Sequence, residues 1–355
     1  MELWTTGAAA PRATMKLARE VEAGGWDGLA VVDSQNLSGD PYVALAMAAT
    51  VTSRIGLATA VTNSVTRHAA ATATAIASVN RVADGRAVLG IGRGDSALAH
   101  LGRAPGKVGH FERYLRQLQT YLRGEAVPFD EIDIPTDVAP PMAELGLADA
   151  PADSRIRWMQ GTAKVPVEVA ATGPRVIGIG AVHAERVMFT LGADLDRLAW
   201  GIAVAREARE RAGLDPDGVA FGAYINCACH PDIAVARRLV RGGLTTFARF
   251  NVMHGQTTGP WSDSALKALH TLRDAYDMNK HTRGDSAQAG TLTDDFTDHF
   301  AVVGTPEQCI GKLQALAGLG LDKLVFGGRL GLSAEPEAGE AIALLEGQVL
   351  PAVRG

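Results

Sequence analysis

The chain has 355 residues, of which 47% are hydrophobic, and a formal net charge of −5. This length and apolar content allow a large buried core and exclude a small module held together by disulfides. Lysine and arginine form no dense run, so the composition argues against nucleic acid or an anionic membrane surface as a partner.

The first residues and the cysteines indicate the compartment. The N-terminus enters a strand-like run directly, without the basic and apolar regions of a signal peptide, and no stretch has the length and apolarity of a membrane-spanning helix. Cys227, Cys229 and Cys309 are too few and odd in number for a disulfide framework. We therefore expect a cytoplasmic protein with no membrane partner.

Eight short apolar runs of β type recur along the chain, each followed by a turn signal and a helical pattern. Several are continuous rather than alternating in hydrophobicity, as expected for parallel strands covered by helices. We predict an α/β fold, a (β/α)8 TIM barrel, forming a single domain over residues 1–355. The predicted strands are Glu2–Thr6, Gly28–Asp33, Ile55–Thr62, Arg86–Gly92, Val165–Ala171, Arg186–Leu191, Val219–Cys229 and Lys323–Gly327.

Two connections are too long for simple crossovers, one over residues 97–163 after the fourth strand and one over about 245–300 after the seventh. Long insertions in compact folds are usually functional, and we expect both to cover the mouth of the barrel. Residues 124–154 contain eight acids, five prolines and no lysine or arginine. This composition predicts an irregular loop or lid, with a solvated linker as the alternative.

Ligands of such a barrel bind where the parallel strands end, so the residues just past each strand are the candidate site. They are small, amide or hydroxyl groups without an evident pair of nucleophile and base, which favours a large bound cofactor over a hydrolytic triad and leaves the catalytic residues unassigned. The ends of strands two to five and of strand eight carry Asp33-Ser34, Ala60-Val61-Thr62-Asn63, Gly92-Arg93-Gly94-Asp95, Thr172-Gly173 and Gly327-Gly328-Arg329.

Three features of this ring allow more than one interpretation. The glycines of 90–96 let the main chain approach a flat ring or a phosphate, but they also suit a plain tight turn in which Arg93 and Asp95 pair with each other. Asp33 follows a buried strand and needs a partner if it is buried too. Cys227-Ala228-Cys229-His230 lacks the spacing of a metal site, and we predict no metal.

Two motifs resemble the bacterial luciferase-like superfamily, in particular its branch that uses the deazaflavin coenzyme F420 and includes methylenetetrahydromethanopterin reductase. One motif runs from Ala60 to His68 and the other from Asp84 to Ser96, and Ala171-Thr172-Gly173-Pro174 matches the phosphate-side turn of that family. The resemblance implies a non-prolyl cis peptide between Ala60 and Val61, on a bulge behind the cofactor ring. It also implies that Asp33 and the backbone amides of Thr172 and Gly173 hold the cofactor. Together with the strand ends, this predicts cofactor binding by Asp33, Ala60, Val61, Thr62, Asn63, Gly92, Arg93, Gly94, Asp95, Thr172 and Gly173.

From the resemblance we expect an oxidoreductase that transfers a hydride between F420 and a small organic substrate. Ser34 follows Asp33 where several alcohol-oxidising relatives have a histidine, which argues against alcohol oxidation by that route. The alternatives are an FMN-dependent monooxygenase of the same superfamily and a noncatalytic barrel that binds a cofactor. The alanine-rich segments 42–50 and 69–79 predict apolar helix faces, and with them a homodimer.

Overall fold

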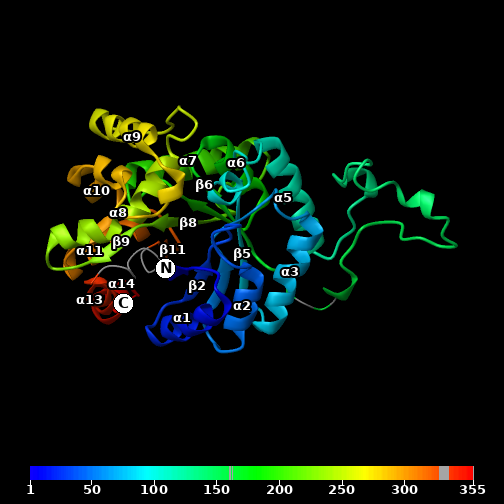
Figure 1. Ribbon diagram of the computed structural model, residues 1–355, viewed down its shortest axis with the longest axis horizontal. Coiled ribbons are helices and arrows are strands. Elements are labelled where there is room, and N and C mark those ends of the chain that lie inside the picture. The colour runs from blue at the N-terminus through cyan, green and yellow to red at the C-terminus, as the bar shows by residue number, and fades with distance from the viewer. Residues whose placement is uncertain (160, 162, 328–335, 355) are drawn as a thin grey trace.

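The computed structural model describes residues 1–159, 161, 163–327 and 336–354, and its centre is a closed barrel of eight parallel strands (Figure 1). The ring closes because β3 pairs with both β2 and β5. The predicted fold class is therefore confirmed, and every predicted strand overlaps an observed one. In order around the barrel the strands are β1 (Glu2–Gly7), β2 (Gly28–Val31), β3 (Gly56–Thr59) with its continuation β4 (Thr62–Asn63), β5 (Ala87–Gly92), β6 (Val167–Ala171), β7 (Arg186–Phe189), β8 (Ala220–Ile225) and β11 (Lys323–Phe326).

Helices surround the barrel, and their ends follow the local signals of the sequence. Asp40 caps one of them by accepting hydrogen bonds from the backbone N–H groups of Tyr42 and Val43, which satisfies donors that a helix leaves unpaired. The outer helices are α1 (Pro11–Ala23), α2 (Pro41–Ala49), α3 (Ala69–Val82), α5 (Val108–Leu122), α6 (Pro174–His183), α7 (Leu195–Arg211) and α11 (Pro306–Gly318), followed by α13 (Ala338–Leu344), the π-helical turn η6 (Leu345–Val349) and α14 (Leu350–Arg354).

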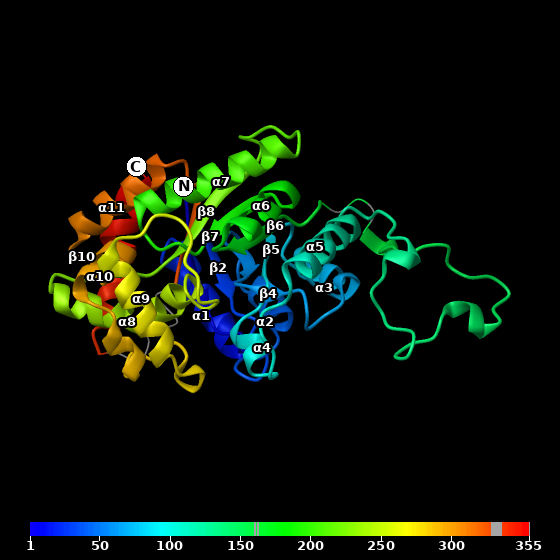
Figure 2. The ribbon, with the colours of Figure 1, turned by 90° about the horizontal axis from the view of Figure 1, so that it is seen from above.

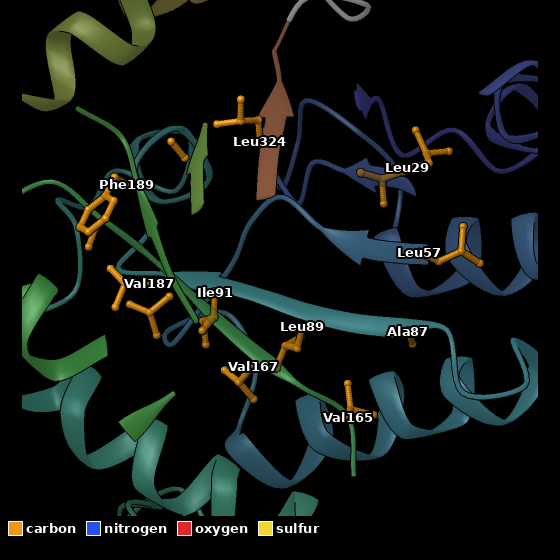
Figure 3. Packing of buried hydrophobic residues seen from close by; sticks show 14 of the residues in the cluster. Leu29, Leu57, Ala87, Leu89, Ile91, Val165, Val167, Val187, Phe189 and Leu324 are labelled. Atoms are coloured by element: carbon orange, nitrogen blue, oxygen red, sulfur yellow. The ribbon is translucent and has the colours of Figure 1, made fainter. Parts of the chain in front are cut away.

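Alternate residues of the strands pack on opposite sides of the barrel wall. Leu29 and Leu57 belong to the large cluster between the strands and the helices, which Figure 3 shows from close by. Their neighbours Ala30 and Ala58 join Trp4 in a small inner cluster. The Trp4 ring fills the inside of the barrel, because a Cβ added at Gly28 or Gly56 would meet it at 2.2–2.3 Å.

The amino ends of the strands form the floor of the barrel, and buried charges close it. The ammonium of Lys323 lies 2.9 Å from the carboxylate of Glu168 and 3.4 Å from the centre of the Trp4 ring. Arg186 pairs with the same carboxylate at 2.5 Å. Glu168 and Lys323 are 2% and 1% exposed, so this ion pair closes the floor without access to water.

The insertion after β8 lies against the mouth of the barrel, by which we mean the carboxyl ends of its strands. The predicted strand Val219–Cys229 is wrong as one element, because it breaks at Asn226 into β8 and a second strand that leaves the barrel. That strand pairs with one the sequence did not predict, in a two-stranded parallel sheet. The insertion consists of β9 (Cys227–Cys229), α8 (Ile233–Phe250), α9 (Asp263–Ala275), η4 (Met278–Lys280), η5 (Ala287–Thr291), α10 (Asp294–Phe300) and β10 (Val302–Gly304).

The insertion after β5 divides into two parts with different positions. The short helix α4 (Ser96–Ala99) and the loop after it remain at the mouth, where the backbone N–H of Gly106 donates to the Arg93 carbonyl. The acid-rich segment does not cover the mouth as expected, but projects sideways beyond α3 and α5 (Figures 1 and 2). It contains the short turns η1 (Phe129–Glu131) and η2 (Met142–Leu145), and the turn η3 (Arg157–Met159) follows it.

None of the helices in the described parts of the chain combines the length and the apolar character needed to cross a membrane.

Candidate active site

Asp33 lies just past β2 and is 3% exposed. One of its carboxylate oxygens accepts from the Thr62 hydroxyl at 2.7 Å and from the Arg67 guanidinium at 2.8 Å. The prediction that a buried Asp33 needs a partner is thus confirmed, although the sequence did not identify Arg67. Arg67 also lies over the Tyr42 ring, 5.0 Å from its centre, and burial raises the pKa of Tyr42 to about 12, which keeps this phenol neutral.

The third barrel strand is interrupted by the cis peptide bond between Ala60 and Val61, where the resemblance implied it. At this interruption the Thr59 carbonyl approaches β5 so closely that a Cβ added at Gly90 would lie 2.1 Å from its oxygen. Only glycine therefore fits at position 90. Ala60 and Val61 are half-buried against the inner apolar cluster and form a smooth apolar wall at the mouth.

The glycine turn after β5 does not form the internal ion pair that was one interpretation of the sequence. The side chain of Arg93 donates through Nε to the Gly106 carbonyl at 2.7 Å, whereas Asp95 pairs with Arg249 of α8 at 2.5 Å. Gly94 has a φ of +83°, and a Cβ there would lie 2.9 Å from the Leu98 side chain. Glycine at this position lets the turn place the two charged side chains on different partners.

Several buried polar atoms beside this turn lack a partner. The Nδ2 of Asn63, the Oγ of Ser64 and the Oε1 of Gln35 make no hydrogen bond within the described part of the chain. Asn63 is 1% and Ser64 2% exposed. The other end of the Asn63 amide is held, because its Oδ1 accepts from the N–H groups of Val65 and Thr66. Buried polar atoms without partners are costly, so this edge of the site suits a ligand that offers hydrogen-bonding groups.

The turn after β6 provides the start of a helix and a second arginine. Gly173 is the N-cap residue of α6, no side chain caps this helix, and a Cβ at Gly173 would meet nothing within 4 Å. The hydroxyl of Thr172 contacts that of Thr190. Arg175 is exposed in the first turn of α6 and makes no ion pair with any residue that the structure describes. A free helix N-terminus with a nearby cation favours an anionic group such as phosphate.

The field around the mouth is mainly positive. Burial and the neighbouring charge of Arg175 lower the pKa of Arg93, because the two guanidinium groups repel each other. Burial and the charges of Arg93 and Arg249 lower the pKa of His254 from its ordinary value. A bound anion would relieve this repulsion between like charges.

Helix α8 and the segment after it cover the mouth of the barrel. The sequence predicted that this insertion would cover the mouth, but it did not identify the residues that do so. The Phe247 ring stacks on Tyr224, with ring centres 6.4 Å apart. Arg249 lies under the Tyr276 ring at 4.7 Å, and the Tyr276 hydroxyl is 2.7 Å from Nδ1 of His281. Burial raises the pKa of Tyr276 and lowers that of His281, so both groups stay neutral near pH 7.

The remaining predicted positions are placed as follows. Gly92 is buried on β5 and pairs in register with Asn63 of β4. The structure thus brings the ends of strands two to five together around one apolar wall. Cys227, Cys229 and Cys309 are buried free thiols. Gly328 and Arg329, at the end of the last strand, lie outside the described residues.

Comparisons with known proteins agree with this geometry. The sequence pattern of the family described as luciferase-like monooxygenase matches residues 2–323. Among curated proteins, the chain is 25% identical over 344 residues to 5,10-methylenetetrahydromethanopterin reductase of Methanolobus tindarius, covering 94% of each chain. It is also 25% identical over 351 residues to the enzyme of the same name from Archaeoglobus fulgidus, covering 94% of this chain and 93% of the relative.

Solved structures share the fold. The F420-dependent tetrahydromethanopterin reductase of Methanopyrus kandleri superposes with a TM-score of 0.74 at 20% identity and covers 99% of this chain and 98% of its own. An F420-dependent secondary alcohol dehydrogenase in complex with an F420-acetone adduct gives 0.72 at 16% identity, covering 100% and 99%. The family match extends over nearly the whole sequence and coincides with the barrel that the structure shows. The chain therefore belongs to the luciferase-like monooxygenase family.

Proposed function

We propose that the protein is an F420-dependent oxidoreductase that transfers a hydride between F420 and a small organic substrate. The observation that carries the proposal is the combination, at one mouth, of the apolar wall of Ala60 and Val61 with buried polar atoms that lack a partner among the described residues. Beside them lie two arginines, Arg93 and Arg175, that form no ion pair with any described residue. Curated relatives of similar length bear the name of a reductase, and two similar folds are described as F420-dependent. These names support an enzyme of the redox class.

The residues fit the chemical groups of F420. A planar ring needs a flat apolar surface, which Ala60 and Val61 provide, and its pyrimidine edge carries carbonyl oxygens that the free Nδ2 of Asn63 can bind. The phosphodiester suits the uncapped start of α6 at Gly173, with Thr172 beside it. The carboxylates of its glutamate tail suit Arg175, which is exposed beyond that turn.

The protein itself has little proton chemistry to perform in this proposal. When bound, F420 supplies or accepts a hydride at one carbon of its ring. Asp33, Thr62 and Arg67 hold the ends of strands two and three in position. Phe247 on α8 stacks on Tyr224 at the inner side of the mouth. In this proposal the substrate binds between the cofactor and the insertion after β8. The identity of the substrate is open within the class of small organic molecules.

A binding titration tests the cofactor. We expect the protein to quench or shift the fluorescence of F420 at micromolar concentration, and to bind FMN more weakly because FMN has no carboxylate tail for Arg175. A Gly173→Glu variant places a negative charge where no side chain obstructs it and is expected to weaken F420 binding about tenfold. Gly311→Glu, at an equally open position on α11, is the matched control.

An FMN-dependent monooxygenase is the second candidate. It is favoured by a solved Baeyer–Villiger monooxygenase of Pseudomonas putida in complex with FMN, whose fold superposes with a TM-score of 0.64 at 17% identity over 99% of this chain and 98% of its own. If the titration shows FMN bound and F420 not bound, the first proposal is wrong. Oxygen consumption with supplied reduced FMN would then support the second, and binding without any turnover would indicate a noncatalytic barrel.

The assembly and the compartment remain proposals. We propose a homodimer that forms on the side of α2 and α3, because these helices leave Val43 52% and Val82 48% exposed. The cytoplasmic location and the single-domain organisation predicted from the sequence stay predictions.

A further inference from the structure

Residues 128–153, which we name the arm, lie outside the body of the molecule. The ribbon shows them projecting beyond α3 and α5 in both views (Figures 1 and 2). The structure describes this whole segment, and no residue from 128 to 152 is buried. The arm therefore has no core of its own, and of its large apolar side chains only Ile132 packs against the core of the barrel.

The side chains of the arm are unusual for a solvated loop. Val138 is 73% exposed, Leu145 67% and Leu147 54%, and Ile134 and Phe129 are exposed as well. Surface loops normally leave single apolar residues in water, not a succession of large ones. The same segment holds seven acidic residues and none of the 34 lysines and arginines of the chain.

The root of the arm is firmly held. Val127 and Ser154 exchange two backbone hydrogen bonds of 2.9 and 3.0 Å, and the Tyr121 hydroxyl donates to the Ser154 hydroxyl at 2.7 Å. The carbonyl of Glu131 accepts from Gln117 on α5. These bonds direct the arm away from the body of the molecule, on the side of α5 and α3. The contacts at its base therefore set its direction.

We propose that the arm clasps a second copy of this chain, packing its apolar side chains on the outer face of α2, α3 and α5 of that copy. This face offers apolar contact at Val43 and Val82. It also offers positive charge, because Arg113 and Arg116 are exposed on α5 and neither makes an ion pair within the described part of the chain. The excess of carboxylates on the arm and the guanidinium groups of Arg113 and Arg116 on the receiving face are complementary in charge.

The size of the arm suits this role. A stable protein interface uses roughly 20–30 residues from each partner, and the arm alone approaches that number. In a two-fold dimer each copy contributes one arm and one receiving face, so the contact is made twice. The inference rests on the homodimer proposed above and does not depend on which cofactor is bound.

Sedimentation analysis of an arm-deleted variant is the first test. Because Val127 and Ser154 already pair as neighbouring strands do, a short Asn-Gly turn can replace residues 128–153 without straining the root. We expect the full chain to sediment as a dimer of twice 37.1 kDa and the deleted chain as a monomer, with F420 binding retained by both. A monomeric full chain, or a deleted chain that stays dimeric, overturns the proposal.

Point variants separate the clasp from a loss of folding. Val138→Asp with Leu145→Asp should raise the dimer dissociation constant by about 30-fold or more, and Arg113→Glu with Arg116→Glu on the receiving face should also weaken the dimer. Leu214→Asp, at an exposed apolar position after α7, is the control and should leave the dimer unchanged. Equal effects of the arm variant and this control would contradict the clasp.

Discussion

The floor and the mouth of the barrel differ in the partners of their buried polar groups. At the floor, the carboxylate of Glu168 pairs with Lys323 and Arg186, and the ammonium of Lys323 also lies over the Trp4 ring. At the mouth, Asn63 and Ser64 are as deeply buried, yet they keep polar atoms without partners. The same strands run between the two ends, so the difference comes from the residues at their tips.

This contrast separates stability from function within one barrel. A buried network whose charges are paired with opposite charges fixes the structure, and losing one member leaves an uncompensated charge. An incompletely paired edge costs stability in the free protein and gains it when a ligand supplies the missing partners. In (β/α)8 barrels the amino ends of the strands generally serve stability and the carboxyl ends the site. Substitutions at the two ends should therefore change different measured quantities.

The largest effect is expected from Glu168→Gln at the floor. It leaves Lys323 charged and buried without its carboxylate and removes the nearer of the two carboxylates that pair with Arg186, which should lower the free energy of unfolding by about 3–5 kcal/mol. Chemical denaturation measures this loss. Glu207→Gln is the control, because Glu207 pairs with Arg211 at 3.2 Å with both side chains about two-thirds exposed, and it should cost no more than about 0.5 kcal/mol. Similar losses for both variants would contradict the role of the floor.

Gly90→Ala should have the next largest effect. Its Cβ would meet the backbone carbonyl of Thr59 at 2.1 Å, and backbone atoms cannot move aside without displacing the third strand. We expect a loss of about 1–3 kcal/mol in the free energy of unfolding, together with weaker F420 binding, because Ala60 and Val61 would shift. Gly311→Ala, in a helix with open space around it, should be neutral or stabilise by up to about 1 kcal/mol. A Gly90→Ala protein of normal stability would show that the contact is not tight.

Arg175→Gln at the mouth should change binding and leave stability nearly untouched. Arg175 is exposed and pairs with no described residue, so its loss should alter the free energy of unfolding by less than about 0.5 kcal/mol. Affinity for F420 should fall about tenfold, and the difference should shrink as salt is added. Arg206→Gln, on the outer helix α7, is the control for a general loss of positive charge. An unchanged F420 affinity would remove Arg175 from the site.

Local sequence patterns determined the barrel and predicted where its site should lie. Runs of buried aliphatic residues identified all the barrel strands, because a strand covered by helices must be apolar on both faces. Glycines that the backbone requires, such as Gly90 and Gly94, marked the turn after β5. The position of the cis peptide bond followed from a family resemblance over a few residues around Ala60 and Val61.

Only the tertiary structure decided the partners of the charged groups and the course of the long insertions. Asp33 pairs with Arg67, and Asp95 with Arg249, 154 positions away. Neither pair of residues is related by the repeat of a helix or a strand, so the sequence pattern does not indicate the pairing. The arm is acid-rich and irregular, as its composition predicted, but its direction depends on hydrogen bonds at Val127 and Ser154. Periodicity reports how a segment meets its immediate surroundings, whereas these contacts join segments that come together only after the barrel closes.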